Sequence, residues 1–232
     1  MQERLKIINL SKNFVLHTQN GAVLNILNNV SLEVRDGEIV ALCGPSGVGK
    51  SSLLKAVFGT YRISQGDLVI NCGAKEIHLA KASPAEIIEL RKHTIGYVSQ
   101  FLRVIPRVPT IEIVANAAIE AGASSQQATE KAVALLEQLR IPKKLHTLSP
   151  LTFSGGEQQR VNIARAMSAP RPIMLFDEPT ASLDPENKTT VLTMIAGLKK
   201  SGTAILGIFH DRNDREFLNA REVEMEKYKE PE

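Results

Sequence analysis

The sequence predicts an α/β fold built around a buried parallel sheet. Several segments are continuous apolar runs of strand length, a glycine-rich loop joins one of these runs to a helical pattern, and a stretch of helical period interrupts the strands between residues 110 and 145. Strands that are covered on both faces have such uninterrupted apolar runs, whereas strands with one solvated face alternate.

The length and composition are those of a globular chain. Its 232 residues lie between one and two average domains, and 43% of them are hydrophobic. A chain of this size buries roughly 70% of its unfolded surface, so it forms a core without disulfides or a metal. The net charge of +3 is spread along the chain without a basic run. We therefore expect no nucleic-acid partner.

The cysteines and the N-terminal segment favour a cytoplasmic location. Cys43 and Cys72 form no CxxC pair, and Cys43 lies in the apolar run "EIVALCG". A buried thiol in a reducing compartment is therefore favoured over a metal ligand or a disulfide. The segment "MQERLKIINLSK" is charged, and no stretch approaches the roughly 18 apolar residues of a membrane span. We expect a soluble protein without a membrane span of its own.

The periodicity places strands first and helices later. Strand patterns cover residues 4–10, 23–34 and 38–43, the last after the turn signal Asp36-Gly37, and recur at 66–70, 94–99, 172–177 and 203–209. Residues 111–122 and 128–139 place apolar residues at three- and four-residue intervals, which predicts a helical insert.

No internal repeat or linker divides the chain. We therefore expect one domain over residues 1–232, with a core lobe at about 1–100 and 158–232 and a helical lobe at about 101–157.

The strongest local signal is "GPSGVGKS" at residues 44 to 51, between an apolar strand and the helix pattern "KSSLLKAVFG". This context predicts a phosphate-binding P-loop, in which glycines turn backbone N–H groups toward a phosphate. A glycine-rich turn with an incidental lysine is the alternative, which the spacing and flanks disfavour. Lys50 is expected to reach the β- and γ-phosphates, and the Ser51 hydroxyl to bind Mg²⁺. The other residues expected at the nucleotide are Gly44, Pro45, Ser46, Gly47, Val48, Gly49 and Ser52.

A pair of acids ends the later strand "IMLFDEPT". We expect Asp177 to hold Mg²⁺ with Ser51, and Glu178 to act as the general base for the attacking water. Adjacent acids after a strand are often only a solvated strand end, but the P-loop makes the catalytic interpretation the better one.

A second loop, "SGGEQQR" at residues 154 to 160, offers backbone donors, a hydroxyl and a helix N-terminus, but no lysine. One nucleotide already held by residues 44–51 has little need of it. The simplest explanation is that this loop serves a nucleotide bound to another subunit.

The strings "GPSGVGKS", "FSGGEQQR", "IMLFDEPTASLD" and the final histidine of "TAILGIFH", in that order, resemble the ATP-binding cassette (ABC) ATPase family over nearly the whole chain. The resemblance implies a P-loop NTPase fold with a RecA-like core, an N-terminal antiparallel β subdomain and a helical subdomain. It also implies that two cassettes pair head to tail around two molecules of ATP with Mg²⁺.

Further roles come from the same resemblance. Gln100 would contact Mg²⁺ and water and sense a partner, and His210 would act as a switch at the γ-phosphate. Asp184 would lie at the dimer interface, and Phe14 would stack on adenine. Taken singly, Gln100 and Phe14 are more typical of surface or packing residues, and His210 of a hydrogen-bonded histidine. The loop expected to reach the partner's nucleotide comprises Ser154, Gly155, Gly156 and Glu157.

The strings "GYVSQFLRVIPR", "TFSGGEQQRVNIAR", "GIFHD" and "FVLHTQNG" resemble more narrowly the PhnL group, the ABC-type ATPases of the bacterial phosphonate carbon–phosphorus lyase system. This implies soluble lyase subunits as partners, a second cassette that is either a copy or a PhnK-type protein, and support for forming ribose 1-methylphosphonate 5-triphosphate from ATP and methylphosphonate. Residues 101–107 would be the docking surface, or simply a basic surface turn stiffened by proline.

Two other functions stay open at this point. The segment "QFLRVIPRVPTIEIVAN" broadly resembles lipoprotein- and macrolide-exporter ATPases, which favours a motor subunit for a membrane exporter. A binding module that clamps on ATP without turnover is the third possibility.

Three features depart from the usual family pattern or from the PhnL group: Ser51 where threonine is common, Phe153 for leucine, and a tail after residue 210 that matches the PhnL group only loosely.

Overall fold

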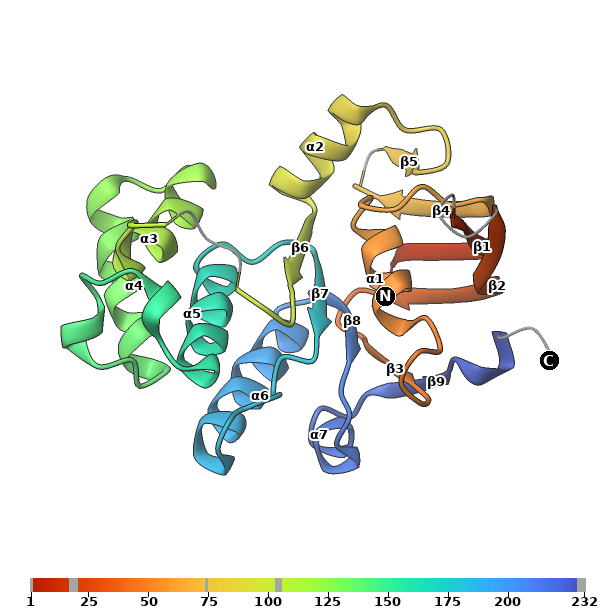
Figure 1. The fold of residues 1–232 in the computed structure, drawn as a ribbon. Coiled ribbons are helices and arrows are strands. Elements are labelled where there is room, and N and C mark those ends of the chain that lie inside the picture. The colour runs from red at the N-terminus through yellow and green to blue at the C-terminus, as the bar shows by residue number, and fades with distance from the viewer. Residues whose placement is uncertain (1, 17–20, 74, 103–105, 229–232) are drawn as a thin grey trace.

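The computed structural model describes residues 2–16, 21–73, 75–102 and 106–228, which form two sheets and a group of helices (Figure 1). Three residues of the expected docking segment, 103–105, lie outside the described residues. The first sheet is antiparallel, with strand order β2-β1-β4-β5. Its strands are β1 (Glu3–Leu16), β2 (Ala22–Arg35), β4 (Gln65–Asn71) and β5 (Glu76–His78).

The second sheet is parallel and has the strand order β6-β7-β8-β3-β9. Strands that run in the same direction end at the same edge, so the loops that follow β3, β6, β7 and β8 come together. The strands are β3 (Ile39–Cys43), β6 (Ile95–Val98), β7 (Ile173–Asp177), β8 (Ala204–Ile208) and β9 (Arg221–Glu224).

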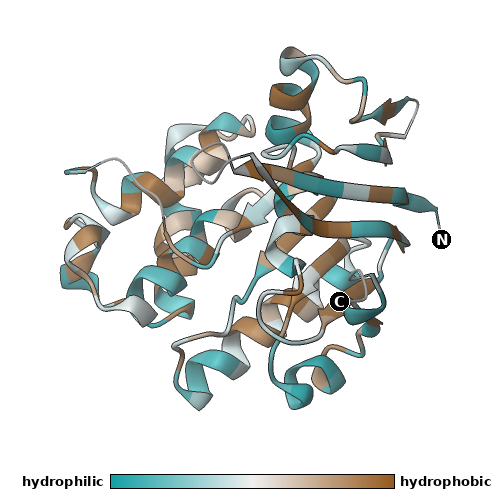
Figure 2. Cartoon of the chain, turned by 45° about the vertical axis from the view of Figure 1, so that its right-hand side comes forward, coloured by the Kyte–Doolittle hydropathy of each residue, from teal (hydrophilic) through white to brown (hydrophobic). Residues whose placement is uncertain are grey.

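Both faces of the central strands β3, β7 and β8 are buried, which explains their unbroken apolar runs. In β3, Ile39 and Ala41 face a core shared with the helices, whereas Val40 and Leu42 face a core shared with the antiparallel sheet. Strand β7 alternates in the same way. Hydrophobic residues accordingly run along the central strands, while the helices alternate hydrophobic and hydrophilic turns (Figure 2).

Local signals set where the helices begin. Ser83, Ser124 and Ser154 each start a helix with a capping box, in which the serine and the residue three positions later satisfy each other's backbone N–H groups. The helices are α1 (Lys50–Val57), α2 (Pro84–His93), α3 (Thr110–Glu120), α4 (Ser125–Gln138), α5 (Gly155–Ser168), α6 (Pro185–Lys200) and α7 (Arg212–Phe217), with short 3₁₀ turns at Lys143–Leu145, Pro150–Thr152 and Glu226–Tyr228.

Helices α3, α4 and α5 pack together to one side of the sheets (Figure 1). The predicted helical insert is therefore present, and the α/β fold with an antiparallel β subdomain is confirmed. Helix α5 packs on α3, on α4 and on β6, so it belongs to both lobes. Arg160 adds to this link, because its guanidinium donates to the carbonyls of Leu139 and Arg140 and to the Asn187 side chain. Within the described ranges, no helix is long and apolar enough to cross a bilayer.

Gly66 offers a test of the contact between β1 and β4. Both Gly66 (φ +82°) and Gly73 (φ +93°) have left-handed backbones, but a Cβ at Gly66 would lie 2.3 Å from the Asn9 carbonyl oxygen, and one at Gly73 would meet nothing within 4 Å. Gly73→Ala is expected to cost about 1–2 kcal/mol, and Gly66→Ala about 1–3 kcal/mol more. Urea unfolding of the two variants checks this, and equal losses would contradict the predicted steric contact.

Candidate functional site

The loop between β3 and α1 has the backbone shape of a phosphate cradle. Gly44, Gly47 and Gly49 have φ values of +122°, +85° and +95°, which L side chains rarely adopt. A Cβ at Gly49 would also lie 2.7 Å from the Ile26 carbonyl oxygen on β2. Glycine is therefore required at this position for both conformation and space. The first turn of α1 carries no acidic residue, so its N-terminus stays favourable to an anion.

The Lys50 side chain folds back over this loop and is hydrogen-bonded to its backbone. Its Nζ donates to the carbonyl oxygens of Gly44 at 2.6 Å and Pro45 at 2.7 Å, and the residue is 7% exposed. The ammonium is thus already held inside the loop. Phosphate oxygens can take the place of the carbonyl acceptors, so a buried positive charge and the loop's N–H groups would face one anion.

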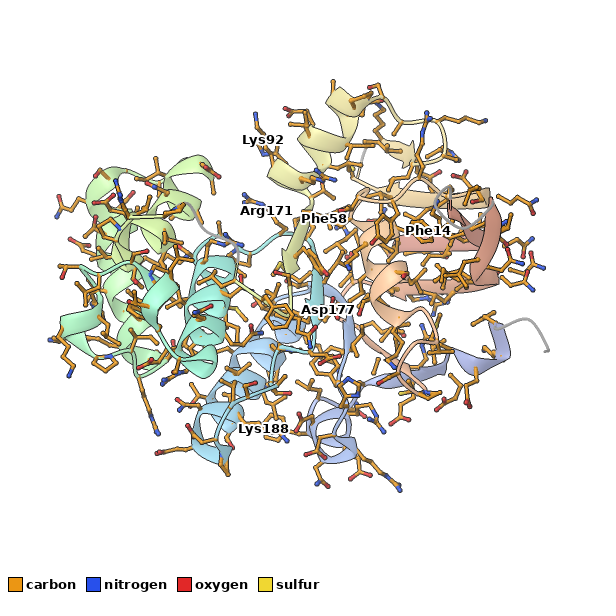
Figure 3. All side chains as sticks on the ribbon, viewed as in Figure 1. Phe14, Phe58, Lys92, Arg171, Asp177 and Lys188 are labelled. Carbon is orange, nitrogen blue, oxygen red and sulfur yellow. The ribbon has the colours of Figure 1, made fainter. Side chains whose placement is uncertain are left out.

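Ser51 and Asp177 place two oxygen ligands side by side. The Ser51 Oγ donates to Asp177 Oδ1 at 3.0 Å, and the Tyr97 hydroxyl donates to Asp177 Oδ2 at 2.8 Å. Asp177 is 3% exposed and lies where β7 ends, at the centre of the molecule (Figure 3). Hydroxyl and carboxylate oxygens are the ligands that Mg²⁺ prefers, and the set fits a magnesium ion that bridges to a nucleotide phosphate. No sequence pattern predicted a role for Tyr97.

Glu178 is held by two other predicted residues. Gln100 Nε2 donates to Glu178 Oε2 at 3.0 Å, and His210 Nε2 lies 2.7 Å from Glu178 Oε1. The three side chains come from the ends of β6, β7 and β8. Glu178 has a left-handed backbone (φ +54°), which is strained for a non-glycine residue. Such strain is typical of functional sites, where neighbouring contacts hold the residue in place.

A cavity of about 260 Å³ joins these groups. Its wall brings together the P-loop, Glu178 and His210, so the predicted phosphate loop and two of the three predicted catalytic residues share one space, and Gln100 does not line it. A second cavity, of about 550 Å³, is lined by Ser51, Asp177 and Gln100. The first cavity is lined by Ile26, Ser46, Gly47, Gly49, Lys50, Ser51, Ser52, Glu178 and His210.

The second glycine loop does not line either cavity. Ser154 caps α5: its hydroxyl accepts from the Glu157 N–H and donates to the Glu157 carboxylate, which lowers the pKa of Glu157. Ser154 and Gly155 are exposed. Gly156 lies so near the loop before α6 that a Cβ would be 2.8 Å from the Ser182 carbonyl oxygen. The loop is therefore closely packed at Gly156, whereas Ser154 and Gly155 are open to solvent.

Asp184 and Phe14 also lie outside the P-loop cavity. Asp184 is the N-cap of α6, and hydrogen bonds from the Asn187 and Glu186 N–H groups lower its pKa. Phe14 packs edge-on against Tyr61, with ring centroids 5.1 Å apart, and Lys12 lies over its ring. Both residues have structural contacts of their own, and their expected roles at the interface and the adenine stay predictions.

Cys43 is a buried free thiol directly before the P-loop, as the sequence predicts. Burial raises its pKa to about 11, so it is protonated at neutral pH.

These features define a P-loop nucleotide-binding protein, and comparison with known proteins gives its family. A family profile described as "ABC transporter" matches residues 27–181. The chain belongs to the ABC transporter family of ATP-binding proteins.

Three curated relatives have names that mention different substances: lipoprotein, arginine and macrolide. The chain is 34% identical to the lipoprotein-releasing system ATP-binding protein LolD of Hyphomonas neptunium, covering 91% of this chain and 90% of LolD. It is 36% identical to the arginine transport ATP-binding protein ArtP of Haemophilus influenzae, covering 88% and 83%. It is 32% identical to the macrolide export ATP-binding/permease protein MacB of Vibrio parahaemolyticus, over 93% of this chain but only 32% of MacB. The chain thus spans about a third of the length of the MacB relatives.

Solved structures agree with this assignment. The dimeric post-hydrolysis structure of the ATP-binding cassette MJ0796 bound to ADP and Pi has a TM-score of 0.83 and 28% identity, and the match covers 92% of this chain and 90% of that one. A second dimeric structure of MJ0796 has a TM-score of 0.82 and 26% identity, with 95% and 94% covered.

Lys50 carries the first functional prediction. Among the described residues that line the P-loop cavity, Lys50 carries the one ammonium. Lys50→Met removes it, so binding of a fluorescent ATP analogue with Mg²⁺ should weaken by about 10- to 100-fold. The matched control is Lys92→Met on α2, whose ammonium pairs only with Glu89 among the described residues. Wild-type affinity in Lys50→Met would contradict the phosphate role of this loop.

Proposed function

We propose that this chain is the ATP-hydrolysing subunit of an assembly in which two cassettes close around ATP. One observation carries the proposal: the Glu178 carboxylate is held by Gln100 and His210 at the wall of the cavity that Lys50 and the P-loop also line. A clamp without turnover would have no need of a carboxylate held in this way.

The chain's own groups account for the chemistry of hydrolysis. Ser51 and Asp177 would hold Mg²⁺, which when bound neutralises charge that develops on the phosphates. Lys50 and the loop N–H groups would hold the transferred phosphoryl group. Glu178 lies where it can accept a hydrogen bond from water and align it for attack, with Gln100 and His210 fixing the direction of its oxygens.

A second chain is needed because the site is open on one side. The loop at residues 154–156 offers backbone donors and a helix N-terminus, is exposed, and lies outside the P-loop cavity of its own chain. In a head-to-tail dimer, this loop of one protomer would face the nucleotide on its partner. Hydrolysis would then depend on closure of the dimer. The dimeric MJ0796 structures support this arrangement.

For the assembly itself, we propose the soluble phosphonate carbon–phosphorus lyase system, with a second copy or a PhnK-type cassette as the other subunit. The support is the PhnL-like strings around residues 96–107 and 152–165. The nucleosidase and lyase chemistry would reside in other subunits, and this chain would contribute ATP-driven conformational change. The names of LolD, ArtP and MacB favour a second candidate, the ATPase subunit of a membrane transporter.

Glu178→Gln tests the ATPase role. The variant keeps the shape of the side chain but loses the base, so hydrolysis should fall by at least about 100-fold while ATP binding persists. It should also elute as a dimer with ATP and Mg²⁺, because the closed state no longer turns over. Glu89→Gln, an exposed acid on α2, is the matched control. A Glu178→Gln variant that hydrolyses ATP at the wild-type rate would refute the role of Glu178.

The same trapped variant distinguishes the two assemblies. Tagged Glu178→Gln is purified from its native cell with ATP and Mg²⁺, and the proteins that accompany it are identified by mass spectrometry. Soluble phosphonate-lyase subunits support the proposed assembly, whereas integral membrane permeases would make the transporter the correct one.

A further inference from the structure

Glu178 and His210 lie on two loops, one after β7 and the other after β8. The backbones of the two loops are hydrogen-bonded to each other only where the loops begin. The Glu178 N–H donates to the Ile208 carbonyl at 3.2 Å, which is the last bond between the β7 and β8 ends. After that point the chain turns into α6 on one side and α7 on the other. His210 is half exposed, with 53% of its side chain accessible. Contacts other than this backbone pairing must therefore set the 2.7 Å distance between His210 Nε2 and Glu178 Oε1.

One buried carboxylate connects these loops. Asp214 on α7 is 2% exposed. Its Oδ2 accepts a hydrogen bond from the Thr180 hydroxyl at 2.9 Å, two residues after Glu178. We call this contact the Thr180 arm. Because Thr180 is part of the same tight turn as Glu178, the arm restrains the strained backbone that presents the catalytic carboxylate.

The other oxygen of Asp214 reaches the His210 loop through a lysine. Lys188 on α6 lies 2.8 Å from Asp214 Oδ1 and 2.5 Å from Asp211 Oδ2, and Asp211 directly follows His210 (Figure 3 labels Lys188). We call these contacts the Lys188 arm. The hydrogen bond from Lys188 lowers the pKa of Asp211, and the bond to Asp211 raises that of Lys188. Asp211 and Lys188 therefore stay charged at neutral pH.

Arg215 adds a second hold on the same loop. Its guanidinium donates to the Phe209 carbonyl at 2.8 Å and the His210 carbonyl at 2.9 Å, and it pairs with Glu222 on β9. The backbone of His210 is thus fixed to the sheet, and the two arms of Asp214 fix that backbone relative to Glu178.

We propose that Asp214 is the positioning residue of the Glu178 and His210 pair. Its two arms set the distance between them, although Asp214 itself touches neither side chain. The role rests on the proposed function. It also gives a route by which a partner could be sensed, because α6 begins at Asp184, only one turn before Lys188, and this helix start would face the other protomer in the dimer.

The deciding variant is Thr180→Val. Replacing the buried Asp214 would test folding as well as positioning, because Lys188 would lose its buried partner. Thr180→Val is nearly isosteric and removes only the hydroxyl of one arm. Thr180→Ser keeps the hydroxyl. Thr193→Val on α6 is the matched control, since Thr193 is exposed and, within the described part of the chain, its hydroxyl bonds only to the Thr189 carbonyl in its own helix.

Steady-state ATPase assays give the first readout. Thr180→Val should lower kcat about tenfold with an unchanged KM for ATP, whereas Thr180→Ser and Thr193→Val should keep the wild-type kcat. In a His210→Ala background, Thr180→Val should cause no further loss, because the pair it positions is already broken. A wild-type kcat in Thr180→Val, or losses that multiply in the double variant, would overturn the proposal.

Crystal structures of the wild type and of Thr180→Val give a readout that needs no activity. The Glu178 and His210 side chains should separate beyond hydrogen-bond distance in the variant and stay paired in Thr193→Val. Unchanged pairing in Thr180→Val would overturn the role of Asp214. A wild-type chain that hydrolyses no ATP would refute the proposed function instead, and the crystal structures would still decide the positioning role.

Discussion

Parallel pairing of β3, β7 and β8 is the constraint on which the site depends. Because these strands run in one direction and are buried on both faces, the loop after β3 and the side chains after β7 and β8 all emerge at one edge. The P-loop, Asp177, Glu178 and His210 are brought together by this topology although they are far apart in sequence. The antiparallel sheet adds a second constraint, because β2 presses against Gly49 and leaves room for glycine alone.

The same edge of the sheet also provides the partners that stabilise the charged groups of the site within one chain. Its charged groups are already satisfied by neighbours: Lys50 by loop carbonyls, Asp177 by Ser51 and Tyr97, and Glu178 by Gln100 and His210. These described charged groups thus have internal partners, which offset the cost of burying them. Binding of a nucleotide would exchange these internal contacts for contacts with phosphate, metal and water. The glycine loop at the start of α5 also has an internal acceptor, because the Glu157 carboxylate accepts from the Ser154 N–H and hydroxyl.

The sequence predicted the features that depend on local chemistry. Glycine spacing predicted the P-loop, the apolar runs predicted the strands of the parallel sheet, and three- and four-residue intervals predicted the helical insert. It did not predict α2, α6, α7, β5 or β9, which are short or carry mixed polar and apolar residues whose burial is decided by tertiary packing. The contact of Tyr97 and the two arms of Asp214 were not predicted either. Each joins residues from different elements, and no local sequence pattern marks them. The pairing of Glu178 with Gln100 and His210 was predicted neither by spacing nor by the family resemblance, which implied contacts of Gln100 with Mg²⁺ and water and of His210 with the γ-phosphate.

The central claim is that each site is shared between two chains, and complementation of two inactive variants tests it most directly. Lys50→Met impairs the P-loop, and Gly155→Glu places a carboxylate on the exposed loop, where a Cβ meets nothing within 4 Å and the fold is undisturbed. In a mixed dimer, one site combines the intact P-loop of one chain with the intact glycine loop of its partner. Each variant alone should hydrolyse no ATP, and an equal mixture should recover about a quarter of the wild-type rate. A mixture as inactive as its components, or full activity in Gly155→Glu alone, would contradict the shared site.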